Sequence, residues 1–131
     1  MVELRIETHR REELVNITER IARIVTTSGI QNGILVIQSP HTTLGLTANE
    51  NADPAVVRDL LGHLRTLVPP DAPFQHQERN SDSHIKVSLV GPSLSLIIHQ
   101  GQVMLGTWQG IFACEFDGPR QRRLWIQIVG Q

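Results

Sequence analysis

Residues 33–39 read Gly-Ile-Leu-Val-Ile-Gln-Ser, a short aliphatic run that begins with a glycine. The run is too brief for a helix and is rich in β-branched residues, which is typical of a buried strand. Pro40 ends it, because proline fixes its own backbone angle and restricts the residue before it. We therefore predict a central strand, then a tight connection over residues 40–43 and a second strand through Leu46 and Ala48.

Two further elements are expected on the N-terminal side of this strand. Apolar and charged residues alternate over residues 2–7, which predicts a half-buried strand. Over residues 11–28 the apolar positions return every three or four residues, which predicts an amphipathic helix with Gly29 as its C-cap. The helical positions are Leu14, Ile17, Ile21 and Ile24.

On the C-terminal side the sequence predicts one more helix and then mostly sheet. Asp53-Pro54 has the chemistry of a helix start, and the apolar stripe continues to Leu67. A proline-rich stretch over residues 68–73 ends the helix, and residues 75–83 form a long polar loop. Strand-like pieces follow at residues 84–90, 94–98, 103–105 with 111–116, and 122–129. We predict a single α+β domain over residues 1–131, with two helices and stacked, largely antiparallel or mixed sheets.

The composition excludes several classes of protein. Lys and Arg total 12 against 13 Asp and Glu, so no global charge draws in nucleic acid or an anionic membrane. Cys114 is the only cysteine, which excludes an intrachain disulfide and a multi-cysteine zinc site and suggests a buried, inert thiol. No apolar run is long enough for a bilayer span and no secretory leader is visible, so we expect a soluble, cytoplasmic protein.

Three of the six histidines, His41, His76 and His84, stand apart from the others. His41 follows the central strand in a loop, where sheets commonly present functional groups, and the other two bracket the polar loop. Three neutral imidazoles from separate rigid segments, with an open fourth position, make a typical catalytic metal site. The alternative is that one is a loop histidine with its hydrogen bonds made within the protein and that the other two are unrelated to it. The spacing alone does not decide between a metal site and this alternative.

A polar cluster, Asn-Glu-Asn-Ala-Asp over residues 49–53, stands immediately before the second predicted helix. Asp53 is expected first as the N-cap of that helix, with a catalytic role as the less favoured alternative. Glu50 is either a solvated loop residue or a general base or further metal ligand near His41. The sequence leaves both interpretations of Glu50 open.

Two further groups of side chains are candidates for ligand binding. Trp108 and Gln109 stand between two glycines and either line a pocket or form a bulged strand with the indole in the core. Four basic residues are the best candidates for a phosphate or pyrophosphate cradle, although such residues beside a turn are more often a solvated face. These basic residues are Lys86, Arg120, Arg122 and Arg123. The sequence contains no Walker-type phosphate-binding loop, no dinucleotide-binding fingerprint, no G-x-S-x-G nucleophile elbow and no H-E-x-x-H zinc-binding helix.

Five stretches taken together resemble the YjbQ-type family, which is often named the secondary thiamine-phosphate synthase family. They occur in the family's order and span essentially the whole chain. The resemblance implies a compact α+β fold of stacked sheets with two helices, commonly assembled as a homotrimer, with a metal-binding pocket near the subunit boundaries. The stretches are SPHTT at 39–43, NENADP at 49–54, residues 76–86 ending in SHIK, GTWQ at 106–109 and EFDGPR at 115–120.

The resemblance also implies roles for individual residues. His41, His76 and His84 match recurrent histidines of the family and are assigned to the metal. The polar positions assigned to catalysis are Glu50, Asn51, Asp53 and Gln109, and those assigned to the substrate or its phosphate are Asn80, Lys86, Trp108 and Arg120. Arg79 departs from the family pattern, which usually has glycine there, and serines replace alanine at 81 and 83. These departures place the shape of the loop and the substrate preference in doubt.

The activity attributed to the family joins a thiazole phosphate to a pyrimidine pyrophosphate and releases pyrophosphate. A divalent metal with Lys86 and Arg120 would neutralise the charge of the leaving group. Three imidazoles favour Zn²⁺, whereas pyrophosphate chemistry usually recruits Mg²⁺ through oxygen ligands. Because of this mismatch, two interpretations stay open: the reaction is the main activity of the protein, or it is a secondary activity. We expect an enzyme, with metal-assisted hydrolysis of a small phosphorylated metabolite as the competing reaction.

An alternative from another class is a non-catalytic module that binds a phosphorylated metabolite or RNA. RNA is the less expected ligand, because the chain has two Trp, three Phe and no Tyr with which to stack bases. A membrane partner is not expected. The sequence itself does not show the trimer, which rests on the resemblance.

Overall fold

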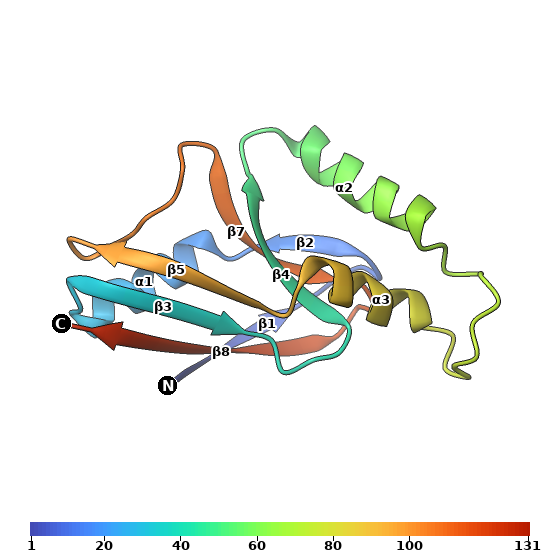
Figure 1. Ribbon diagram of the computed structural model, residues 1–131, viewed down its shortest axis with the longest axis horizontal. Coiled ribbons are helices and arrows are strands. Elements are labelled where there is room, and N and C mark those ends of the chain that lie inside the picture. The colour runs from blue at the N-terminus through green and yellow to red at the C-terminus, as the bar shows by residue number, and fades with distance from the viewer.

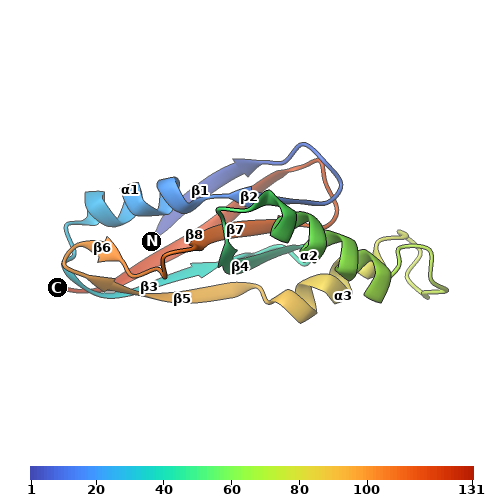
Figure 2. The same cartoon turned by 90° about the horizontal axis from the view of Figure 1, so that it is seen from above.

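The computed structural model describes residues 1–131 as three helices and eight strands, and the strands form two antiparallel sheets. The first sheet has the order β1-β8-β3-β5-β6 and the second the order β2-β7-β4. The helices α2 and α3 lie together at one end of the molecule, and α1 lies toward the other (Figures 1 and 2). No helix is both long and apolar enough to cross a membrane. The elements are β1 (Val2–Glu7), β2 (Glu13–Asn16), α1 (Thr18–Ser28), β3 (Asn32–Gln38), β4 (Leu44–Glu50), α2 (Pro54–Leu67), α3 (Ser81–Val90), β5 (Ser93–His99), β6 (Gln102–Val103), β7 (Gln109–Glu115) and β8 (Gln121–Gly130).

The strand β3 lies at the centre of the first sheet, between β8 and β5, as its aliphatic run predicts. Leu35 and Ile37 point inward and are fully buried, whereas Ile34 on the opposite face is exposed. The inward side chains of both sheets share one core with Ile21 and Val25 of α1. The predicted α+β fold class is therefore confirmed.

The only cysteine, Cys114 on β7, is free and buried. It packs with Val87 and Phe116 in a second, smaller core between β7 and α3. Burial raises the pKa of the Cys114 thiol to about 12. The thiol is therefore uncharged near neutral pH, and its environment is that of the inert residue predicted.

The helix predicted over residues 11–28 is only partly correct. Its first part forms β2 instead, where Leu14 and Val15 pair with β7. The helix α1 begins at Thr18, whose N–H and hydroxyl donate hydrogen bonds of 3.1 and 2.6 Å to Oδ1 of Asn16. An asparagine that bonds the backbone two residues on favours a turn over a continuing helix. Apolar spacing alone does not reveal this break.

The helix α2 begins and ends where the sequence predicts. Oδ1 of Asp53 accepts a hydrogen bond of 2.9 Å from the N–H of Ala55, and Pro54 occupies the first turn. Asp53 is therefore the N-cap of α2. The last helical residue is Leu67, just ahead of the proline pair.

The strand predicted over residues 84–90 is wrong, because this stretch lies in α3. Its apolar residues alternate with polar ones, which is typical of a strand, yet only Val87 among them is well buried. The inward face of α3 is polar instead, with Asp82, Ser83 and Lys86 fully buried. Nζ of Lys86 lies 2.8 Å from Oδ2 of Asp82, a contact between residues one helical turn apart. The fold therefore has three helices rather than the two predicted.

Candidate functional site

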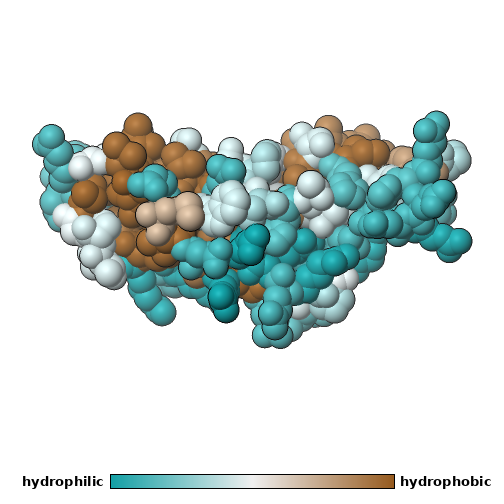
Figure 3. All heavy atoms as spheres, turned by 90° about the horizontal axis from the view of Figure 1, so that it is seen from below, coloured by the Kyte–Doolittle hydropathy of each residue, from teal (hydrophilic) through white to brown (hydrophobic).

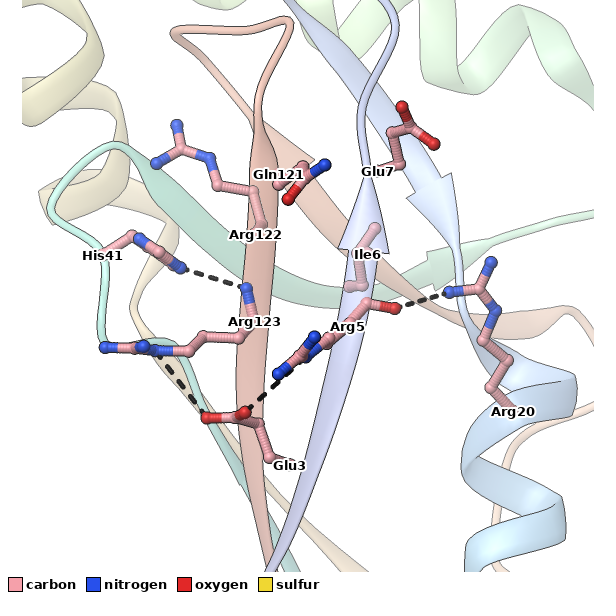
Figure 4. Close-up of a pocket in the computed structure, with 9 residues that line it drawn as sticks. All are labelled: Glu3, Arg5, Ile6, Glu7, Arg20, His41, Gln121, Arg122 and Arg123. Atoms are coloured by element: carbon pink, nitrogen blue, oxygen red, sulfur yellow. Dashed lines mark hydrogen bonds and ion pairs between the residues drawn. The ribbon is translucent and has the colours of Figure 1, made fainter.

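A basic pocket of about 790 Å³ opens where β1, β8, α1 and the loop after β3 meet. Figure 4 shows the side chains that line it, and Figure 3 shows hydrophilic side chains gathered over the middle of the face seen from below. We name this hollow the basic pocket. Its cationic and imidazole side chains are Arg5, Arg20, His41, Arg122 and Arg123, and its acidic ones are Glu3 and Glu7.

Two of the arginines face each other directly across neighbouring strands. Arg5 on β1 is the register partner of Arg123 on β8, and both are exposed. Like charges placed directly opposite destabilise a sheet. Glu3 offsets this only in part, because its carboxylate lies 3.9 Å from Nε of Arg5 and 3.8 Å from Nε of Arg123. The basic pocket therefore keeps positive charge that an anion would neutralise.

The other two arginines use their charge in different ways. Nε of Arg122 donates to buried Glu115 at 2.8 Å and Nη2 donates to the hydroxyl of Thr43 at 2.7 Å, so its charge is neutralised within the protein. Arg20 reaches over from α1 and donates to the backbone carbonyl of Arg5 at 3.2 Å (Figure 4). A guanidinium carries five N–H donors, so most of those on Arg20 remain available to a ligand.

His41 is held against β8 at one side of the basic pocket. Its Nε2 accepts a hydrogen bond of 3.1 Å from the backbone N–H of Arg123. In the neutral ring the proton therefore sits on Nδ1. Burial lowers the pKa of His41, and the positive charges of Arg122 and Arg123 lower it further. At pH 7 the imidazole is neutral and offers one N–H donor beside the arginines.

His76 and His84 lie together in a different hollow. Their ring centroids are 5.4 Å apart in an edge-to-face arrangement, and with Phe74 and Ile85 they line a hollow of about 360 Å³. His41 lines the basic pocket instead. No group of three or more His, Cys, Asp or Glu side chains is placed to hold a metal ion. Within one chain, the predicted three-histidine metal site is not formed.

The structure brings two of the predicted polar clusters together at one end of the second sheet. Glu50 is the register partner of Gln109, and the N–H of Asn51 donates to the carbonyl of Trp108 at 2.9 Å. Oε1 of Gln109 accepts a hydrogen bond of 2.8 Å from the N–H of Gly106, which fixes the intervening loop. The Trp108 residue is 64 % exposed and is no part of the core. These residues line neither hollow, so the catalytic roles of Glu50, Asn51 and Gln109 and the substrate-binding role of Trp108 stay predictions.

Three of the residues predicted to bind the substrate or its phosphate, Asn80, Lys86 and Arg120, are bonded to carboxylates of the protein itself. Fully buried Lys86 lies 3.2 Å from Glu12, in addition to its contact within α3. Asn80 and Arg120 both donate to Oδ2 of Asp117, at 2.8 and 3.0 Å. Lys86 therefore ties α3 to the connection between β1 and β2, and it lines neither hollow.

Arg5 and Arg20 escape prediction from the sequence. The alternation over residues 2–7 marks Arg5 only as an outward residue of a strand. Its partner Arg123 is among the predicted phosphate candidates, but no local pattern reveals that the first strand pairs with the last or in which register. The one signal in the sequence is that residues 3, 5 and 7 are all charged. This signal indicates a binding surface only when the pairing of β1 with β8 is known.

The chain is similar in sequence and in structure to several proteins. It is 53 % identical over 125 residues to a UPF0047 protein of Methanocaldococcus jannaschii, which covers 95 % of this chain and 91 % of the relative. It is 43 % identical over 128 residues to the UPF0047 protein YugU of Bacillus subtilis, which covers 97 % of each.

Solved structures agree closely with the fold. A YjbQ/UPF0047 family protein of Clostridium acetobutylicum matches with a TM-score of 0.97 at 43 % identity, over 98 % of this chain and 100 % of the other. A YbjQ-like protein of unknown function from Sulfolobus solfataricus matches with a TM-score of 0.96 at 32 % identity, over 99 % of this chain and 96 % of the other.

These comparisons overturn the predicted activity. The relatives carry only the UPF0047 designation, and the protein from S. solfataricus is described as of unknown function. None of these descriptions mentions thiamine phosphate or a metal. The chain also forms no metal site. The prediction of a metal-binding, zinc-dependent thiamine-phosphate synthase is therefore wrong.

The resemblance to the family itself is confirmed. The family model described as UPF0047 protein YjbQ-like matches residues 2–131. This range contains all five stretches that carry the resemblance in the sequence. The chain therefore belongs to the YjbQ-like UPF0047 family.

Proposed function

We propose that the protein binds a small phosphorylated metabolite through its anionic group in the basic pocket. The observation that carries this proposal is the direct opposition of Arg5 and Arg123, which share the single carboxylate of Glu3 at long distance. Such a like-charge pair lowers the stability of the sheet. An anion between the two guanidinium groups removes that repulsion and gains hydrogen bonds from both.

The size and donor set of the basic pocket support a phosphate ester. The volume of about 790 Å³ falls within the range of roughly 300–1,000 Å³ that is typical of small-molecule sites. Guanidinium groups bind phosphate oxygens in a bidentate geometry with strong, charge-assisted hydrogen bonds. The free donors of Arg20 and the N–H of His41 add further contacts on either side.

Calorimetric titration with inorganic phosphate and butyl phosphate at low salt tests this proposal. We expect both to bind, and Arg5→Ala and Arg123→Ala each to weaken binding about tenfold through the loss of charge-assisted hydrogen bonds. Arg58→Ala is the matched control, because this arginine is exposed on α2 and lines neither hollow. Unchanged affinity in both pocket variants, or no binding by the native protein, would overturn the proposal.

We further propose that the phosphorylated ligand is a substrate. The lowered pKa of His41 keeps its imidazole neutral at pH 7, which is the form that a general base requires. Phosphorus NMR of the protein with a panel of phosphate esters would detect turnover. We expect His41→Gln to bind the same esters without converting them. Binding without conversion by the native protein would point to a carrier instead.

We also propose that the protein forms a homotrimer, the assembly that the family resemblance implies. Val129, Ile34 and Ile97 are register partners across β8, β3 and β5, and all three are exposed on the same face of the first sheet. Figure 3 shows a block of apolar side chains at one end of the molecule, apart from the polar middle. Contiguous exposed apolar patches are typical of association surfaces. We name these three residues the apolar row.

A cytoplasmic location is part of this proposal. Phosphorylated small metabolites are retained inside cells by their charge. The single cysteine is free, so the fold depends on no disulfide and needs no oxidising compartment.

A further inference from the structure

The basic pocket contains a second pair of side chains that the binding of an anion does not explain. Glu7 on β1 is the register partner of Gln121 on β8, and both are exposed and line the pocket. They lie on the same face as Arg5 and Arg123, the next pair along the two strands. The ion pairs of the pocket involve Glu3, and Glu7 takes part in none of them.

The spacing between the two pairs follows from strand geometry. Glu7 is two residues from Arg5, and residues two apart on one face of a strand are separated by about 7 Å. The backbone positions that carry the cationic pair and the pair made of a carboxylate and an amide are therefore about 7 Å apart along the strands. Figure 4 shows Glu7 and Gln121 at one end of the pocket and Glu3 at the other, with Arg5 and Arg123 between.

We propose that the ligand of the basic pocket is a phosphorylated amine, whose ammonium group is held by Glu7 and Gln121 while its phosphate lies between Arg5 and Arg123. This inference rests on the proposed function and names the class of ligand. Glu7 supplies the opposite charge and accepts hydrogen bonds, and the carbonyl of the Gln121 amide accepts another.

The same arrangement disfavours a ligand with a second anionic group. The charge on Glu7 repels a second anion placed beside it, because charges closer than the screening length of about 8 Å at physiological salt are only partly screened from each other. A neutral tail gains nothing from Glu7. The charge pattern of the pocket, positive at one pair and negative at the next, is matched by a ligand with the reverse pattern.

Calorimetric titration with 4-aminobutyl phosphate and with butyl phosphate tests this inference. The two probes differ only in the terminal amine, which is fully protonated at pH 7 like that of lysine. We expect the amine to bind about two- to fivefold more tightly, the range for an exposed ion pair. Glu7→Gln should abolish this preference and leave the affinity for butyl phosphate unweakened, and Gln121→Glu should increase the preference.

The outcomes separate this inference from the proposed function. Failure of both probes to bind would overturn the function proposed for the basic pocket. Equal affinity for the two probes, unchanged by Glu7→Gln, would overturn only the assignment of a phosphorylated amine. Asp59→Asn is the control, because this exposed carboxylate on α2 lines neither hollow and should leave the ratio of affinities unchanged.

Discussion

Arg79 adopts a left-handed backbone conformation, with φ of 61°, immediately before the N-cap of α3. A side chain other than glycine costs about 1–2 kcal/mol in this region, because its Cβ approaches the following carbonyl oxygen. The resemblance described above implies glycine at this position. Arg79 is therefore a point of backbone strain in the loop that leads into α3.

Replacing this arginine with glycine should stabilise the protein. We expect Arg79→Gly to raise the free energy of unfolding by about 0.5–1 kcal/mol, since the greater freedom of glycine in the unfolded chain offsets part of the relieved strain. Arg58→Gly in the interior of α2 is the control and should lower it by about 1 kcal/mol. Urea unfolding measures both. A loss of stability in Arg79→Gly would mean that contacts of the arginine outweigh its strain.

His41 offers a direct reading of the charge in the basic pocket. Its pKa is lowered by burial and by Arg122 and Arg123, so the unfolded chain takes up a proton first as the pH falls. The contribution of this group to stability is therefore present above pH 6.5, the ordinary histidine value, and is lost as the pH falls from there to the folded pKa.

Binding of an anion should reverse part of this shift. We expect saturating inorganic phosphate to raise the pKa of His41, because the phosphate neutralises Arg123 next to the ring. NMR titration of the histidine resonances measures this, with His99 at the end of β5 as the internal control. An unaltered His41, or an equal change in His99, would show that phosphate binds elsewhere.

At the scale of single elements, α3 is held by charges rather than by an apolar stripe. Lys86 bridges Asp82 and Glu12, and Arg11 makes two hydrogen bonds to Asp82 at 3.0 and 3.3 Å. Arg65 of α2 reaches the same Glu12 at 3.1 Å. This network connects α3 to α2 and to the segment between β1 and β2.

The network makes stability depend on pH in a defined direction. Burial raises the pKa of Asp82, but hydrogen bonds from Arg11 and Lys86 outweigh it and hold that pKa below its ordinary value. The contribution of Asp82 is therefore present above the unfolded value of about 3.9 and is lost as the pH falls through the folded pKa.

Removing one or both partners should give different results. We expect Lys86→Met to lower the free energy of unfolding at pH 7 by about 3 kcal/mol, because it removes the buried cation between Asp82 and Glu12 and leaves only the more exposed Arg11 and Arg65 beside them. Adding Asp82→Asn to that variant should recover part of the loss and flatten the dependence of stability on pH below 4. Urea unfolding from pH 3 to pH 7 measures both effects. A single variant as stable as the native protein would contradict a structural role for Lys86.

The same helix shows what local patterns leave out. Hydrophobic period predicts β3, β5 and α2 well, because the residues that face the interior in each of them are mostly apolar, although Ile34, Ile97 and Leu67 are exposed. It fails for α3, where Asp82 and Lys86 face inward and the stabilising partners lie far away in the sequence. It also fails at Asn16, where one side-chain hydrogen bond decides between helix and strand. Asp53, whose partner lies two residues on, is predicted correctly as a cap.

For the whole molecule, the two faces of the first sheet differ in what a substitution should do. We expect Leu35→Ala, in the core, to lower the free energy of unfolding by about 2–5 kcal/mol. Its neighbour Ile34 belongs to the apolar row, so Ile34→Arg should change folding of the single chain little and dissociate the oligomer. Light scattering coupled to size-exclusion chromatography measures the mass. A native protein that runs as a monomer would contradict the proposed trimer.

The candidate site also depends on the whole molecule. The sequence alone identifies the family and its polar motifs, and it also predicts Arg122 and Arg123 as candidates for phosphate binding. The basic pocket is not readable, because it arises from long-range pairing of β1 with β8 and from the position of α1 beside them. Residues as far apart in the sequence as Arg5 and Arg123 lie together in the pocket, and no local sequence pattern predicts this.

The pairing of β1 with β8 has a consequence for how the protein is made. During synthesis β1 leaves the ribosome first, yet its hydrogen-bonding partner emerges only after every other element described here. Until β8 is made, the edge of β3 that will pair with it is unpaired, and β1 has no strand to pair with. Contacts between such distant segments form slowly, and unpaired strands invite aggregation. A metabolite bound by Arg5 and Arg123 therefore cannot assist the nascent chain, and protects the protein only once the last strand is in place.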